Sequence, residues 1–148
     1  MGVTFSEFVT FSEFEAQAVS AKIRAANLDT ILLVAPTTTP DRRKEIAALS
    51  TGFIYYLSVS GITGERTHLP PDLEQSVRDL KSLTDKPVCV GFGIHQASQL
   101  QQLSKVADGA IVGTAYVRRM KEHLGETPEK IAGVLRGYSR ELVRYPLH

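Results

Sequence analysis

A short apolar run that ends in closely spaced glycines constrains the fold of this chain more than any other feature. Residues 88–95 read Val-Cys-Val-Gly-Phe-Gly-Ile-His, and a helical pattern follows them. Valines on either side of a cysteine are typical of a strand that is buried on both faces. Gly91 and Gly93 leave the end of this strand without side chains, so peptide N–H groups can approach a ligand closely. The positive end of the following helix points at the same place.

A second run along the chain repeats this arrangement. Residues 109–115 read Gly-Ala-Ile-Val-Gly-Thr-Ala, which is again an apolar strand that ends on a glycine before a helix. One interpretation is that such glycines only mark tight turns where a helix packs on a strand. Because two consecutive strands share the feature, we favour one shared anion site, most simply for a phosphate ester.

Strand, loop and helix alternate along the chain in four repeated units. The predicted strands cover residues 31–35, 53–58, 88–91 and 109–112, and the predicted helices cover residues 12–27, 40–50, 72–83, 97–106, 114–124 and 129–144. Continuous apolar strands are typical of a parallel sheet with helical crossovers. We therefore predict an α/β fold of parallel (β/α) units, with four main strands and flanking helices. A closed barrel of eight units has about 250 residues, so 148 residues form either an open sheet or part of a barrel.

The N-terminus carries a tandem repeat of the hexapeptide Val-Thr-Phe-Ser-Glu-Phe, at residues 3–8 and 9–14. A repeat this short is not a solenoid unit, and we interpret it as a duplication without function. Its alternating pattern is compatible with a short strand. We divide the chain into an atypical N-terminal segment, residues 1–13, and an α/β domain, residues 14–148.

Composition argues against several classes of function. A net charge of +1 lacks the excess of positive charge that is typical of proteins that bind nucleic acid or an anionic membrane. The single cysteine, Cys89, excludes an internal disulfide, indicates a reducing compartment and is expected to be a small buried apolar residue. No apolar run is long enough to span a bilayer, and the N-terminus lacks a secretory signal pattern, so we expect a cytoplasmic protein. The four histidines show no metal-ligand spacing, and no metal site is predicted.

Four motifs, taken in order, resemble those of one known family. They are Leu-Val-Ala-Pro-Thr at 33–37 with Pro-Asp-Arg at 40–42, Gly-Phe-Ile-Tyr-Tyr-Leu-Ser at 52–58 with Ser-Gly-Ile-Thr-Gly at 60–64, Val-Gly-Phe-Gly-Ile at 90–94, and residues 109–115. The four motifs together are specific for one family, whereas any one glycine motif alone is weak evidence for it. From about Phe14 to Tyr145 the chain resembles the C-terminal half of the tryptophan synthase alpha chain. The resemblance implies half of a TIM barrel, corresponding to strands five to eight.

The resemblance also implies a reaction and a partner. The substrate is indole-3-glycerol phosphate, which is cleaved to indole and glyceraldehyde 3-phosphate, and the partner is the pyridoxal-phosphate-dependent beta chain. The chain itself is expected to use no cofactor. Four residues match positions at which the family binds the substrate phosphate, namely Gly64, Gly93, Gly113 and Thr114. Phe92 and Tyr55 match positions that pack the indole ring or line its pocket, and Thr63 matches the loop that closes over the substrate.

The groups that would perform the cleavage have no counterpart in this sequence. The reaction needs an acid for the indole carbon and a base for the hydroxyl proton. In the family these are a glutamate at the end of strand two and an aspartate in the following loop, and no residue here matches either position. Glu65 and Asp72 are assigned no catalytic role. We therefore predict a phosphate-binding half that is inactive alone, and no catalytic residue is assigned.

Three interpretations stay open for a chain of this kind. In the first, the half-barrel binds phosphate esters and self-associates or docks with a complementary half-barrel, because the strands at residues 31–35 and 109–112 leave open edges. In the second, the chain is a folded piece without enzymatic activity or a physiological ligand. In the third, a separate chain supplies strands one to four and restores the lyase activity. The beta-chain contact of the family also uses the half that is not matched here.

Overall fold

The described part of the chain folds into one parallel sheet that is flanked by helices. The computed structural model describes residues 2–4, 13–58, 70–91 and 93–144. The strands are β1 (Gly2–Thr4), β2 (Asp29–Val34), β3 (Ile54–Leu57), β4 (Val88–Gly91) and β5 (Gly109–Ile111). The helices are α1 (Glu13–Ala25), α2 (Pro40–Leu49), α3 (Leu73–Lys81), α4 (Ala97–Leu103), α5 (Thr114–Glu122) and α6 (Pro128–Leu142). All neighbouring strands pair in parallel in the order β1-β2-β3-β4-β5, which confirms the predicted fold class.

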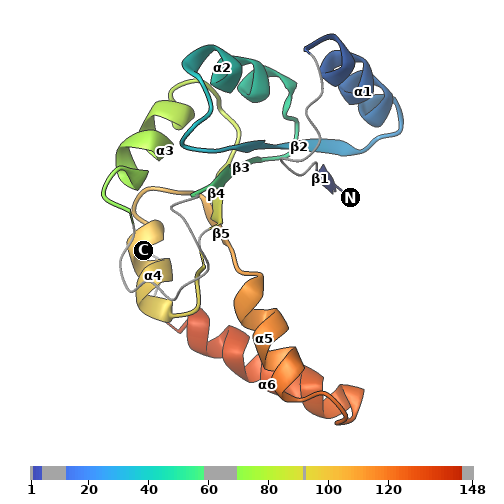
Figure 1. Ribbon diagram of the computed structural model, residues 1–148, viewed down its shortest axis with the longest axis vertical. Coiled ribbons are helices and arrows are strands. Elements are labelled where there is room, and N and C mark those ends of the chain that lie inside the picture. Colours follow the sequence, from blue (N-terminus) through green and yellow to red (C-terminus); the bar gives the residue numbers. More distant parts are fainter. Residues whose placement is uncertain (1, 5–12, 59–69, 92, 145–148) are drawn as a thin grey trace.

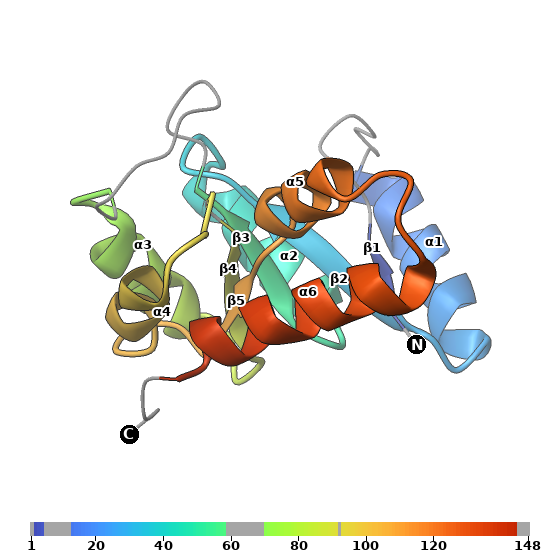
Figure 2. The same cartoon turned by 90° about the horizontal axis from the view of Figure 1, so that it is seen from below.

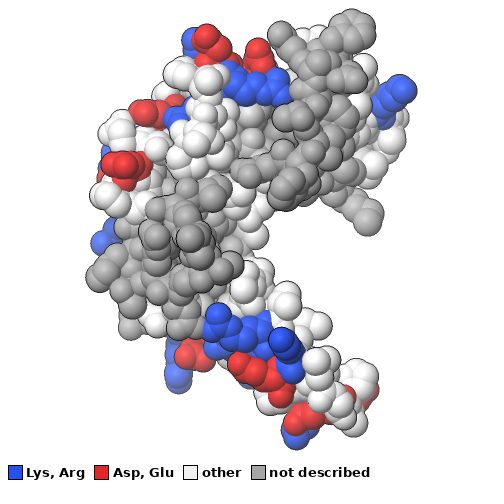
Figure 3. Space-filling model, viewed as in Figure 1, with Lys and Arg blue, Asp and Glu red and all other residues white. Residues whose placement is uncertain are grey.

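The sheet is curved and leaves one side open. In Figure 1 the helices α2, α3 and α4 lie along its convex side, and α5 and α6 extend from the β5 end. Figure 2 also shows α5 and α6 side by side. The space-filling view in Figure 3 shows a C-shaped body whose hollow faces the concave side of the sheet. This arrangement is that of a barrel wall that has not closed on itself.

The hydrophobic core lies between the convex face of the sheet and its helices. Alternate strand residues point to this face because side chains alternate along a strand. The sheet contributes Val34, Ile54, Tyr56, Val88 and Val90, all at most 2% exposed. The helices and the loop after β4 contribute Ile46, Ala47, Leu73, Val77, Leu80, Ile94 and Leu103. Burying one large apolar side chain contributes about 1.5–3 kcal/mol, so this layer is what stabilises the fold.

The concave face presents the other set of strand residues. Leu33, Tyr55 and Cys89 occupy paired positions on β2, β3 and β4, and each is only half-buried. The two tyrosines of β3 therefore point to opposite faces, since Tyr56 lies in the core and Tyr55 lies on the concave face. Burial, with a smaller contribution from the charge of Asp108, raises the pKa of the Cys89 thiol. A thiol with a raised pKa is a poor nucleophile, as expected for a packing residue.

Two features of the sequence prediction are wrong in detail. The edge at β2 is not fully open, because β1 pairs with its first half through Gly2–Asp29, Val3–Thr30 and Thr4–Ile31. Helix α3 ends at Lys81, so Leu83 is 39% exposed instead of lying in the core. The pairing of β1 joins segments distant in sequence, and helix ends depend on tertiary packing as much as on local signals.

Local signals explain where α2 and α6 begin and where α1 ends. Thr39 and Thr127 cap α2 and α6, where their hydroxyls accept from the N–H groups of Arg42 and Lys130, and each is followed by a proline at the first helical position. At the end of α1, Asn27 adopts a φ of 55°, which asparagine tolerates better than most residues. These signals agree with the predicted helix ranges, which begin at residues 40 and 129 for α2 and α6 and end at residue 27 for α1.

Asp108 ties three elements together at the start of β5. Its carboxylate accepts from the Lys81 ammonium at 2.6 Å and from the Val88 N–H at 2.9 Å. Burial disfavours the charged form, but the hydrogen bonds from Lys81 and Val88 and the charge of Lys81 outweigh it, so the pKa of Asp108 is lowered. A carboxyl whose pKa is lower in the folded state stabilises the fold above its unfolded pKa, and this contribution is lost as the pH falls through the folded value.

Asp108→Asn is therefore expected to destabilise the fold at pH 7 by about 1 kcal/mol, after allowance for solvent screening. The difference in unfolding free energy between the variant and the wild type should shrink as the pH falls below about 4, where the wild-type carboxyl becomes protonated. Urea unfolding at neutral and acid pH measures this. Asp85→Asn is the control, because the Asp85 side chain is 96% exposed. An Asp108→Asn effect that is the same at both pH values would contradict the role of the charge.

Candidate phosphate-binding site

The two turns that follow β4 and β5 form the candidate site. Gly93 lies after β4, Gly113 lies between β5 and α5, and Thr114 is the first residue of α5. The strands are direct neighbours, with Gly91 paired to Ile111, so both turns emerge at the carboxyl edge of the sheet. Gly93 adopts a φ of 33°, a conformation that favours glycine. A Cβ atom added at Gly93 or Gly113 would meet no atom of the described residues within 4 Å, and both glycines are exposed.

Both turns offer backbone donors to an anion. No described group accepts the N–H of Gly93 or Ile94. The first N–H groups of α5, at Thr114 and Ala115, also lack acceptors within the described residues, as expected at a helix N-terminus. The hydroxyl of Thr114 stands at the same exposed helix start. This combination of free N–H groups, a hydroxyl and a helix dipole suits a phosphate group.

Two buried side chains form hydrogen bonds to the backbone of the turn after β4. The Gln99 side chain, which is fully buried, accepts through Oε1 from the N–H groups of His95 at 2.9 Å and Gln96 at 3.0 Å. The Tyr138 hydroxyl donates to the His95 carbonyl at 3.1 Å, and His95 Nδ1 lies 2.9 Å from the Gly93 carbonyl. Gln99 is not among the site residues predicted from the sequence. The spacing of Gln96 and Gln99 matches a capping box, which was the available signal.

Tyr55 lies beside the same edge of the sheet on the concave face. A Cβ atom at Gly91 would collide with the Tyr55 ring, so the ring lies directly over this glycine. Burial raises the pKa of the Tyr55 hydroxyl. The structure thus brings Tyr55 close to the end of β4, from which the first glycine turn departs.

The other predicted site residues lie outside the described residues. These are Thr63, Gly64 and Phe92. Within the described ranges, no group of His, Cys, Asp and Glu side chains is arranged to hold a metal ion. The helices described in the structure are all too short or too polar to cross a membrane.

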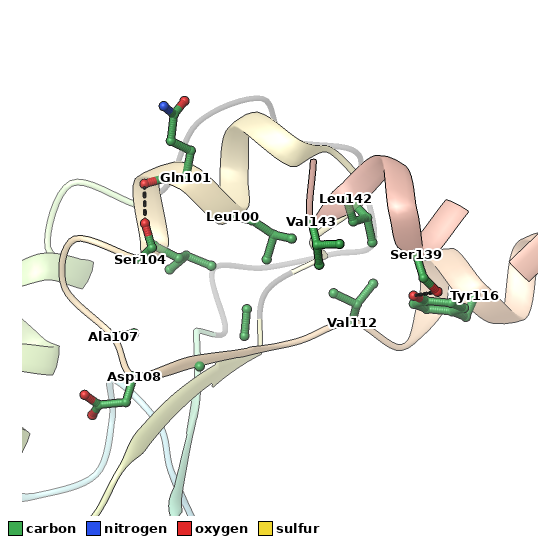
Figure 4. Close-up of a pocket in the computed structure, with 13 residues that line it drawn as sticks. Leu100, Gln101, Ser104, Ala107, Asp108, Val112, Tyr116, Ser139, Leu142 and Val143 are labelled. Atoms are coloured by element: carbon green, nitrogen blue, oxygen red, sulfur yellow. Dashed lines mark hydrogen bonds between the residues drawn. The ribbon is translucent and has the colours of Figure 1, made fainter. Parts of the chain in front are cut away.

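A separate cavity of about 590 Å³ lies between α4, β5 and α6. Figure 4 shows Leu100, Val112 and Leu142 around this space, with Ser139 and Tyr116 at one end. It belongs to the helix layer, and neither Gly93 nor Gly113 lines it. The cavity is therefore distinct from the two glycine turns.

Comparison with known proteins identifies the family. The model of the tryptophan synthase alpha chain family matches residues 10–142. The tryptophan synthase alpha chain of Rhodopirellula baltica is 51% identical over 108 residues, which cover 73% of this chain and 39% of that protein. The alpha chain of Nitrosococcus oceani is 40% identical over 125 residues, which cover 82% of this chain and 46% of that protein.

Solved structures agree with this match. A structure of the tryptophan synthase α2β2 complex from Pyrococcus furiosus aligns with a TM-score of 0.82 at 28% identity, covering 97% of this chain and 56% of that chain. A tryptophan synthase structure from M. tuberculosis aligns with a TM-score of 0.68 at 34% identity, covering 82% of this chain and 44% of that chain. This chain spans less than half the length of the two curated relatives. Together, the parallel sheet, the two glycine turns and these matches show that the chain belongs to the tryptophan synthase alpha chain family.

Proposed function

We propose that this chain provides the phosphate-binding part of a tryptophan synthase alpha-type lyase, which cleaves indole-3-glycerol phosphate to indole and glyceraldehyde 3-phosphate. The supporting observation is the pair of exposed glycine turns at the carboxyl edge of neighbouring strands, with N–H groups that no described group accepts. Gly93, Gly113 and Thr114 would hold the phosphate, and Tyr55 would line the indole side. The proposed roles of Thr63, Gly64 and Phe92 rest on the resemblance alone.

The proposed chemistry also needs a proton donor and a proton acceptor at the substrate. The described residues of the two turns carry no carboxylate, and the chain spans less than half of its curated relatives. We therefore infer that the chain alone does not cleave the substrate, and that a complementary half carrying both carboxylates would be needed. Mixing the chain with such a half and measuring indole release tests this part of the proposal.

The experiment that tests the binding proposal is a calorimetric titration with indole-3-propanol phosphate, an analogue that keeps the ring and the phosphate. Saturable binding with a Kd of about 1 mM or tighter is expected, which corresponds to about 4 kcal/mol of binding free energy. Absence of binding at several times this concentration would favour the alternative, a folded piece without a physiological ligand.

We further propose that the chain associates with a second copy or with a complementary half-barrel. Leu33 and Tyr55 on the concave face are only half-buried. Val117 and Met120 on α5 are 63% and 45% exposed, and Leu124 just after it is 75% exposed. These three residues have the spacing of one helix face, and apolar surface of this kind marks an interaction site. The beta chain, which would carry pyridoxal phosphate, is a second proposed partner, and the cytoplasm is the proposed location.

Light scattering is expected to give a mass above that of one chain, 16.2 kDa. Val117→Glu places a charge on the exposed apolar stripe and should shift the population toward the monomer without affecting the fold. Lys121→Glu, on the same helix, is the control for an added acidic charge. A wild-type chain that is a single monomeric species at working concentration would contradict the association.

A further inference from the structure

We propose that Gln99 and Tyr138 are positioning residues that clamp the turn after β4, so that the N–H groups of this turn stay directed at an anion. The inference rests on the proposed phosphate-binding function. Neither residue is expected to touch the ligand. Both act through the peptide that joins His95 to Gln96.

The clamp holds this one peptide plane at both of its polar groups. The His95 carbonyl accepts from the Tyr138 hydroxyl at 3.1 Å, and the Gln96 N–H donates to Gln99 Oε1 at 3.0 Å. The preceding N–H, that of His95, donates to the same oxygen at 2.9 Å. A peptide unit is planar. Hydrogen bonds to both its carbonyl and its N–H therefore fix its orientation and the direction of the segment that precedes it. That segment carries Gly93 and Ile94, whose N–H groups are not accepted by any described group.

The two clamping side chains are themselves held rigidly. Gln99 is fully buried, and Tyr138 is 4% exposed. The Arg119 guanidinium carbon lies 3.3 Å from the centre of the Tyr138 ring, and the Tyr116 ring meets it edge-on with centroids 5.0 Å apart. A cation over the face of a tyrosine and an edge-to-face ring both restrict the motion of that ring. The hydroxyl is therefore presented to His95 in one position.

Tyr138 also links the first turn to the second. Its hydroxyl reaches the turn after β4, whereas its ring contacts Tyr116 and Arg119 on α5, the helix that begins at the second turn. A phosphate held by both turns requires a fixed spacing between them. A single buried side chain that contacts the first turn and the helix of the second turn sets this spacing.

Tyr138→Phe tests the clamp, because it removes the hydroxyl and keeps the ring. Amide hydrogen exchange at His95 and Gln96 is expected to speed up about 5-fold to 10-fold, as for the loss of one hydrogen bond. Binding of indole-3-propanol phosphate should weaken by a similar factor. Tyr116→Phe is the matched control, since its hydroxyl bonds to Ser139 Oγ at 2.7 Å and does not reach the turn. This control should leave both measurements at their wild-type values.

A second pair of variants tests Gln99. Gln99→Met removes the acceptor, and Gln99→Glu keeps an oxygen acceptor for both N–H groups, so slower amide exchange at His95 and Gln96 is expected for Gln99→Glu than for Gln99→Met. Tyr138→Phe provides the test if Gln99→Met does not fold. If the wild-type chain binds no analogue, the proposed function fails, whereas faster His95 and Gln96 exchange in Tyr138→Phe alone still supports the clamp. Equal exchange at these amides in Tyr138→Phe and Tyr116→Phe would overturn it.

Discussion

Gly93→Asp is expected to weaken the binding of indole-3-propanol phosphate about a hundredfold. Gly93 is exposed at a φ of 33°, and the new side chain meets no steric obstacle among the described residues. Aspartate is among the residues that tolerate this backbone region, and the fold should therefore be retained. Its carboxylate would stand beside the free N–H groups of the turn and repel the phosphate, and like charges about 4 Å apart near a protein surface repel strongly. Titration calorimetry gives the ratio of the two dissociation constants.

The chain offers a matched control for this substitution. Gly125 also has a positive φ, 95°, and a Cβ atom there would also meet no described atom within 4 Å. It lies in the connection between α5 and α6, away from both glycine turns. Gly125→Asp adds the same charge and comparable backbone strain, and it should leave binding unchanged. Equal weakening by both variants would show that the effect is one of net charge or stability and would remove Gly93 from the site.

Gly91→Ala is expected to destabilise the fold by about 1–3 kcal/mol, the usual range for overpacking. The added Cβ atom would collide with the Tyr55 ring, which lies over Gly91 on the concave face. The ring or the strand must shift to make room. In the background of Tyr55→Ala the collision is removed, so the same substitution should have a much smaller effect. Urea unfolding of the four proteins in this double-mutant cycle measures the coupling between the two positions.

Gly133→Ala is the control for replacing glycine itself. Gly133 lies within α6, and a Cβ atom there would meet no atom of the part of the chain that the structure describes within 4 Å. Alanine favours a helix over glycine, so this variant should be neutral or stabilising by about 0.5–1 kcal/mol. If Gly91→Ala leaves the free energy of unfolding unchanged while Tyr55 is present, the close approach of the Tyr55 ring to β4 is contradicted.

The sequence predicted the parts of the fold that local patterns control. The continuous apolar runs at β2, β3, β4 and β5 predicted a parallel sheet, because such runs are typical of strands in parallel sheets. The helix starts at Thr39 and Thr127 followed from capping threonines and prolines. The pairing of β1 with β2 and the short end of α3 were not predicted, since both depend on contacts between distant segments.

The site was predictable to a similar extent. Glycine spacing placed Gly93 and Gly113 at neighbouring strand ends, and the structure has both turns exposed at one edge of the sheet. Their role as phosphate ligands remains a prediction. The clamp on the first turn could not be predicted, because Tyr138 lies 43 residues from His95 and reaches it only through the packing of α6. A sequence read locally shows which backbone segments can bind an anion and not which side chains fix them.

The most direct test of the central claim is a nitrogen-15 amide titration of the wild-type chain with indole-3-propanol phosphate. The claim is that the backbone amides after β4 and β5 jointly bind one phosphate. The signals of Gly93, Ile94, Gly113 and Thr114 should move together and saturate at one ligand per chain. If these four signals stay in place up to about 10 mM ligand, well above the expected dissociation constant, or if only signals from other parts of the chain move, the claim is contradicted.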